Sequence, residues 1–255
     1  MNIAVLGQAM VIALLVLAAP LLFRRRTSGA KDKPRAWPAL YFPALGLGFL
    51  LIEIWLIDKA AFWLNDYSSA FALVLTSMLI FSGLGSMIAG RCAAMPKAAS
   101  MIGLIVVLAW IAAMWVGAED FMMRTLDQPW AIKGAMVVIA AAPVSLALGL
   151  PFPLGLIQVG DGRALPWAWG LNGAFSVVAT PLANLMSRDI GFSSLLVAGA
   201  VLYSLAFLVL PVAQARPRAA PLFEPAAPAD PFADLPDPAP AALDPFPAKT
   251  QTSPA

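Results

Sequence analysis

The sequence contains no histidine and only one cysteine, Cys92. A disulfide between two of its own cysteines, a Cys/His zinc site, a histidine-ligated haem and a histidine general base are therefore excluded within this chain. Charged residues are also scarce, at 12% of the 255 residues, whereas a soluble domain carries about 25%. This composition fits neither a soluble fold nor a basic surface for nucleic acid, and we expect no nucleic-acid partner.

Hydrophobic residues dominate the chain, at 61%, and the mean hydropathy is +0.82. Such a composition indicates an integral membrane protein whose principal partner is the lipid bilayer. A chain of this length has room for about seven apolar spans of roughly 20 residues joined by short loops. We therefore expect an all-α fold, a polytopic membrane helix bundle with about seven transmembrane helices.

The composition divides the chain into three parts. Residues 1–36 hold a first transmembrane helix and a basic linker, and residues 37–211 hold a six-helix membrane domain. Residues 212–255 are rich in proline and alanine. Such a segment cannot bury enough apolar surface to fold, so we expect a disordered C-terminal tail.

The basic residues predict how the chain is oriented. Arg24, Arg25 and Arg26 directly follow the first apolar run, and such a cluster holds that end of a helix in the cytoplasm. Following the spans from there places twelve of the 16 Lys and Arg residues on the cytoplasmic side and leaves four outside: Lys59, Arg124, Lys133 and Arg188. We expect the N-terminus outside and the C-terminus in the cytoplasm.

A ridge of polar side chains recurs every four residues along the span from Pro166 to Met186: Asn172, Ser176, Thr180 and Asn184. An unsatisfied amide or hydroxyl in hydrocarbon is costly, so we expect this ridge to face other helices or a watered cavity. Pro181 predicts a kink in the same helix, and Gly173 allows a second backbone to come close. The ridge either holds helices together or lines a path for a substrate or ion.

One carboxylate lies inside a predicted span. Glu53 belongs to the second span, about residues 39–57, and Gly46 lies seven residues earlier on the same helical face. An ionisable group at this depth is costly and is a functional candidate by default. Glu53 serves either a functional role or structural hydrogen bonding.

Small residues predict a helix-packing surface in the third span, about residues 68–90: Ser82, Gly83, Gly85 and Ser86.

An irregular stretch, LPFPLG from Leu150 to Gly155, contains Pro151 and Pro153. Because each proline lacks a backbone donor and disfavours helix in the residue before it, we do not expect an ordinary helix here. The stretch is interpreted as a structural elbow or as a break that exposes backbone to a substrate.

The sequence shows no set of residues that would hold a metal or perform catalysis. The external loop with Glu119, Asp120 and Asp127 is too sparse in ligands for a metal site. No nucleophile is paired with a base, and no cofactor motif is present. We expect no cofactor and no metal.

Four segments, taken together and in this order, resemble the C-terminal membrane half of the bacterial spermidine synthase-like membrane proteins: LGLGFLLIEIWLI (45–57), LTSMLIFSGLGS (75–86), GLPFPLGL (149–156) and PWAWGLNGAFSVV (166–178). The resemblance covers about residues 41–210. It carries over, at matching motif positions, Glu53, Gly83, Gly85, Pro151, Pro153, Trp167, Trp169, Asn172 and Gly173.

The resemblance implies a protein of the bacterial inner membrane that works beside an enzyme. In that family a soluble aminopropyltransferase-like domain with a Rossmann-like fold carries the catalytic carboxylates. Here LGLGF lies within a hydrophobic span and GDGR in a short loop, and neither follows a strand. The chain is therefore expected not to be an enzyme and to partner a separately encoded synthase-like enzyme or a membrane complex.

Two functions follow from these features. In the first, a non-catalytic membrane module binds or passes a small, polyamine-like cation, with Glu53 supplying the charge. Asn172, Ser176 and Thr180 would form the hydrogen-bonding wall, and the prolines would act as gate or hinge: Pro151, Pro153 and Pro181. In the alternative, the chain is a structural scaffold in a membrane complex, and the same residues serve helix packing.

Overall fold

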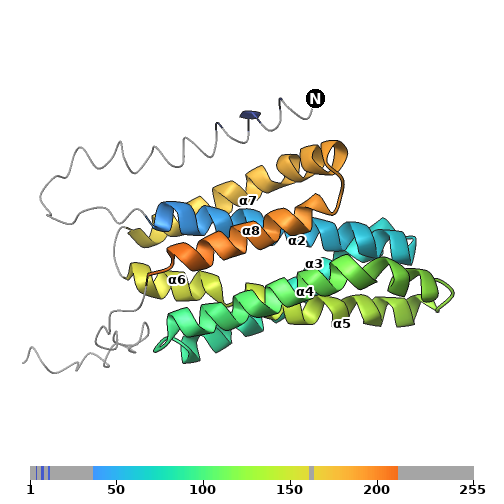
Figure 1. Ribbon diagram of the computed structural model, residues 1–255, viewed down its shortest axis with the longest axis horizontal. Helices are drawn as coiled ribbons and strands as arrows, with labels where there is room; N and C mark the ends of the chain where they lie inside the picture. Colours follow the sequence, from blue (N-terminus) through green and yellow to red (C-terminus); the bar gives the residue numbers. More distant parts are fainter. Residues whose placement is uncertain (1–3, 5–6, 9–10, 12–36, 161–163, 212–255) are drawn as a thin grey trace, which may run out of the picture. The chain divides into compact units, whose positions relative to one another are not determined.

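The structure, a computed structural model, describes residues 37–160 and 164–211, together with Ala4, Gly7, Gln8 and Val11. The chain divides into two units, Met1–Ala215 and Arg216–Ala255, and all described residues belong to the first. Within them the regular structure is entirely α-helical, as predicted (Figure 1). Most of the predicted first span and the whole of the predicted tail lie outside the described residues.

Seven helices are labelled α2 to α8 in the described part: α2 Pro38–Leu64, α3 Tyr67–Arg91, α4 Pro96–Arg124, α5 Trp130–Leu148, α6 Pro151–Val159, α7 Ala164–Asp189 and α8 Ser194–Val209. Helices α5 and α6 form one apolar segment, so these residues make six helical segments, not the seven spans predicted for the whole chain. Four segments are long and apolar enough to cross a membrane: α2, α3, α4 and the combined α5–α6.

Local chemistry explains several helix ends. Asn65 ends α2 in a left-handed conformation, with φ of 53°, which asparagine tolerates better than most residues. Asp66 then caps α3, because its side chain accepts hydrogen bonds from the backbone N–H groups of Ser68 and Ser69. The Lys133 ammonium donates to the carbonyl oxygen of Trp63 at 3.0 Å, which satisfies one of the free carbonyls at the end of α2.

Helix α2 is the most buried of the four spanning segments. Of the residues in its most apolar stretch 72% are buried, against 22% in α3 and 28% in α4. It packs against α7, α8 and α3, and more lightly against α5 and α6. Helix α3 in turn packs on α5, and α4 lies against α5 and α8. Most side chains in this stretch of α2 therefore contact other helices of the bundle.

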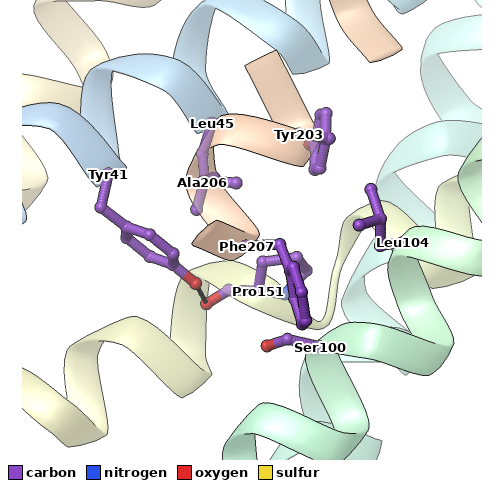
Figure 2. A pocket seen from close by; sticks show the side chains of 8 residues that line it. All are labelled: Tyr41, Leu45, Ser100, Leu104, Pro151, Tyr203, Ala206 and Phe207. Atoms are coloured by element: carbon purple, nitrogen blue, oxygen red, sulfur yellow. Dashed lines mark hydrogen bonds between the residues drawn. The ribbon is translucent and has the colours of Figure 1, made fainter. Parts of the chain in front are cut away.

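The predicted irregular stretch is mostly helix, which corrects the expectation for Leu150 to Gly155. The helical pattern lapses only around Gly149 and Leu150, and α6 begins at Pro151. Pro151 and Pro153 both fall in the first turn, where backbone N–H groups have no helical partner, so their missing donors cost little. The start of α6 is anchored to α2, because the Tyr41 hydroxyl donates to the carbonyl oxygen of Pro151 at 2.6 Å (Figure 2).

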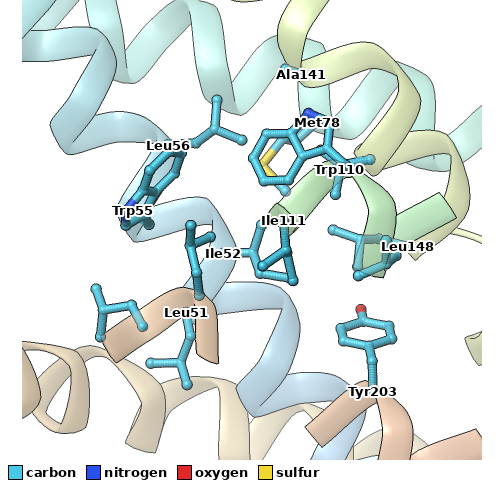
Figure 3. Packing of buried hydrophobic residues seen from close by; sticks show 14 of the residues in the cluster. Leu51, Ile52, Trp55, Leu56, Met78, Trp110, Ile111, Ala141, Leu148 and Tyr203 are labelled. Carbon is cyan, nitrogen blue, oxygen red and sulfur yellow. The ribbon is translucent and has the colours of Figure 1, made fainter. Parts of the chain in front are cut away.

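The buried apolar cluster collects side chains from α2, α3, α4, α5, α7 and α8, part of which Figure 3 shows. At its centre the indoles of Trp55 and Trp110 meet edge to face, with centroids 5.9 Å apart, a favourable geometry for aromatic rings. The labelled members in Figure 3 are Leu51, Ile52, Trp55, Leu56, Met78, Trp110, Ile111, Ala141, Leu148 and Tyr203. The cluster joins α2 to the α3–α4–α5 group.

Candidate functional site

Glu53 lies in the middle of α2 and is only 6% exposed. It follows Gly46 by two helical turns, which places both on the face of α2 that meets α7. Among the residues that the structure describes, none donates a hydrogen bond to its carboxylate or forms an ion pair with it. The structure thus contains a carboxylate inside an apolar bundle without a described cationic partner.

At Gly46, two helical turns before Glu53, α2 and α7 approach each other backbone to backbone. A methyl group at Gly46 would overlap the carbonyl oxygen of Asn172. The Ser176 hydroxyl donates to the carbonyl oxygen of Asn172 at 2.8 Å, and it also lies 3.4 Å from the carbonyl oxygen of Gly46. Both polar residues of α7 are half-buried at this crossing. The structure therefore brings Asn172 and Ser176 to Gly46, on the face of α2 that also carries Glu53 two helical turns further along.

The rest of the polar ridge is placed differently from the expectation that all of it faces inward. Thr180 and Asn184 are exposed, and so is Gly173, which has nothing within 4 Å of the position of an added Cβ. The reason is geometric: a step of four residues turns about 40° around an α-helix, so the ridge rotates away from α2 as it climbs. Among the described residues, Thr180 is exposed, whereas Ser176 is half-buried.

The prolines assigned to a gate or hinge are buried or half-buried. Pro151 and Pro181 are buried and Pro153 is half-buried. Pro151 borders a void of about 10 Å³, whose lining includes Tyr41, Ser100 and Tyr203 (Figure 2). A void of this size holds no more than about one water molecule. The described conformation therefore has no room for a polyamine beside Pro151.

The small residues of α3 divide into two groups. A methyl group at Gly85 would overlap the carbonyl oxygen of Leu146 in α5, and the Ser86 hydroxyl donates to the carbonyl oxygen of Gly149 at 3.1 Å. The backbone of Ser82 lies against Gly149 in the same way. Gly83, in contrast, is exposed and faces open space. The α3–α5 crossing is thus built on Ser82, Gly85 and Ser86.

A cavity of about 240 Å³ lies between α2, α4 and α5, and the sequence analysis did not predict it. Its walls are mainly apolar and include the aromatic side chains of Trp55, Trp63, Trp110 and Phe121. Lys59 also lines it, and its ammonium lies 3.3 Å from a carboxylate oxygen of Glu119. The sequence did hold a signal, because two tryptophans eight residues apart flank a lysine on one helix, and tryptophan favours the membrane interface.

The side chains that the structure describes form no candidate metal site. No group of three or more His, Cys, Asp and Glu side chains is close enough there to hold a metal ion. Cys92 is a half-buried free thiol after the end of α3.

The helices and their apolar lengths define the class of the protein: it is an α-helical membrane protein. Comparisons with known proteins match it to no family model, no curated protein and no solved structure.

Proposed function

We propose that the chain is a non-catalytic, multi-pass module of the bacterial inner membrane that binds or passes a small cation through Glu53. The observation that carries the proposal is the burial of this carboxylate in the middle of α2, at 6% exposure. A carboxylate in such surroundings is costly unless a proton or a cation neutralises it. The resemblance to spermidine synthase-like membrane proteins favours a polyamine-like cation.

The partner in this proposal is a separately encoded synthase-like enzyme, which would supply or consume the cation. The distribution of Lys and Arg supports an N-terminus outside and a C-terminus in the cytoplasm. In this arrangement Glu53 stands within the second span. The half-buried Asn172 and Ser176 lie where α7 meets Gly46, two helical turns before Glu53, and would offer neutral hydrogen-bonding groups along the path.

Binding of spermidine to the purified full-length chain tests the proposal. Glu53→Gln keeps the shape of the side chain and removes its charge, and we expect it to weaken binding by at least about tenfold, or about 1.4 kcal/mol. Asp58→Asn is the matched control, because Asp58 is an exposed carboxylate on the same helix. Equal affinity of wild type and Glu53→Gln, with both proteins folded and monodisperse, would refute the role of Glu53.

The second candidate is a scaffold subunit of a membrane complex. The contact between Gly46 and the Asn172 carbonyl favours it, because small residues at such crossings commonly serve helix association. The scaffold predicts that Glu53→Gln leaves spermidine binding unchanged and that the full-length chain purifies from native membranes as part of a larger complex. Co-purification from native membranes, followed by sizing, measures the second effect.

A further inference from the structure

The aromatic cavity between α2, α4 and α5 has the properties of a ligand site independent of Glu53. Its volume is about 240 Å³, near the lower end of the range for small-molecule pockets. Trp55, Trp63, Trp110 and Phe121 are its aromatic lining residues, and Lys59 is the one charged residue in the described lining. A wall of this kind accepts an apolar chain.

Two buried hydrogen-bond donors stand in this wall without an acceptor. Trp55 and Trp63 are 4% and 5% exposed, and their indole N–H groups have no hydrogen-bond partner among the described residues. Trp110, on the opposite side, donates to the carbonyl oxygen of Ala140 at 2.8 Å. Because a buried indole N–H usually finds a partner, these two donors would be satisfied by an oxygen from outside the described residues.

The charge at the cavity selects the sign of the ligand. The Lys59 side chain is 24% exposed and its ammonium lies 6.0 Å from the centroid of the Trp55 ring, so its positive charge is held at the wall. Its counterion, Glu119, is 81% exposed and therefore interacts weakly in water. A cationic ligand would be repelled here, whereas an anionic group can join or replace Glu119 beside Lys59.

We propose that this cavity binds one acyl chain of an amphiphile with an anionic oxygen headgroup. The chain lies among the aromatic rings, and the headgroup oxygens accept hydrogen bonds from Lys59 and from the indole N–H groups of Trp55 and Trp63. A fatty-acid carboxylate and an anionic phospholipid share this chemistry. The site is separate from the proposed cation site, so either one stands if the other fails.

Quenching of tryptophan fluorescence by a brominated fatty acid tests the proposal on the full-length chain in detergent. Bromine quenches indoles that it contacts, so binding in the cavity gives a saturable decrease. Gly117→Leu is the test variant, because Gly117 lines the cavity and nothing lies within 4 Å of an added Cβ. Gly83→Leu is the matched control, with the same open surroundings on α3 away from the cavity.

We expect the fatty acid to bind Gly83→Leu like wild type and to bind Gly117→Leu at least about tenfold more weakly. Lys59→Gln should weaken binding of the acid several-fold and leave its methyl ester unaffected. Brominated phosphatidylglycerol in nanodiscs distinguishes the two sources of the ligand. If this lipid gives saturable quenching that Gly117→Leu removes, the ligand is a phospholipid. If the fatty acid binds but the lipid gives no such quenching, the ligand is the free acid. Non-saturable quenching, or equal quenching in Gly117→Leu and wild type, would overturn the proposal.

Discussion

Gly83 and Gly85 stand two residues apart on α3 and differ in what surrounds them. Replacing Gly85 by alanine drives a methyl group into the carbonyl oxygen of Leu146, a backbone atom that cannot move aside cheaply. We expect Gly85→Ala to destabilise the folded bundle by about 1–3 kcal/mol. Gly83 faces open space, so Gly83→Ala should stabilise the helix by about 0.5–1 kcal/mol. Thermal unfolding in one detergent measures both; equal midpoints would contradict the described α3–α5 crossing.

For single residues, the sequence predicted which side chains share a helix face better than it predicted what surrounds each of them. Glu53 and Gly46 could be placed on one face from their seven-residue spacing alone. The exposure of Thr180 could not be predicted from the sequence, because it depends on where along α7 the contact with α2 ends. The buried hydrogen bond of Tyr41 also escaped prediction, since its acceptor lies 110 residues away in the sequence.

The start of α3 depends on one carboxylate outside the membrane-spanning helices. Hydrogen bonds from the hydroxyl and backbone N–H of Ser69, and from the backbone N–H of Ser68, hold the pKa of Asp66 below its ordinary value of 3.8. A lowered pKa in the folded state means that the cap stabilises fully at pH values above 3.8 and is lost as the pH falls through the lowered pKa.

We therefore expect Asp66→Ala to lower the midpoint of thermal unfolding at neutral pH, because the cap satisfies backbone donors of α3. The difference from wild type should stay constant at pH values above about 5 and shrink as the pH falls below 3.8. Unfolding midpoints of both proteins across this range provide the measurement. A difference that grows toward low pH would show that Asp66 does not act as the ionised cap.

The helices could largely be predicted because the bilayer leaves few alternatives. Backbone groups in hydrocarbon must be paired within the segment, so a long apolar run becomes a helix. Breaks inside a run are harder to predict, as α5 and α6 show. Pro151 and Pro153 predicted a non-helical elbow, yet a helix that begins at Pro151 accommodates both prolines in its first turn. The proline pattern located the break correctly and overestimated its length.

On the scale of the whole molecule, α2 joins the helices that the sequence separates. It contacts α7 and α8 as well as α3, and its buried residues include both Glu53 and the aromatic wall at Trp55 and Trp63. Both candidate sites therefore depend on one helix. Hydropathy could predict the spans but not the central position of α2. Because every span is apolar, composition does not show which helix packs at the centre of the bundle.

We propose that lipid surrounds this bundle and that α3 crosses the bilayer. At about 1.5 Å per residue, the 25 residues of α3 span roughly 37 Å, which exceeds the hydrocarbon thickness of about 30 Å. The single cysteine, Cys92, directly follows this helix, and Asn65 lies just before it. Each position can carry the only thiol in the chain, either in wild type or in Asn65→Cys combined with Cys92→Ser.

The most direct measurement is labelling of these two proteins in intact cells with a membrane-impermeant maleimide, followed by labelling after lysis. We predict that the thiol of Asn65→Cys reacts from outside, whereas Cys92 reacts only once the membrane is opened. Reaction of both thiols in intact cells would place both ends of α3 on one side of the membrane. That result would contradict the proposal that α3 crosses the bilayer.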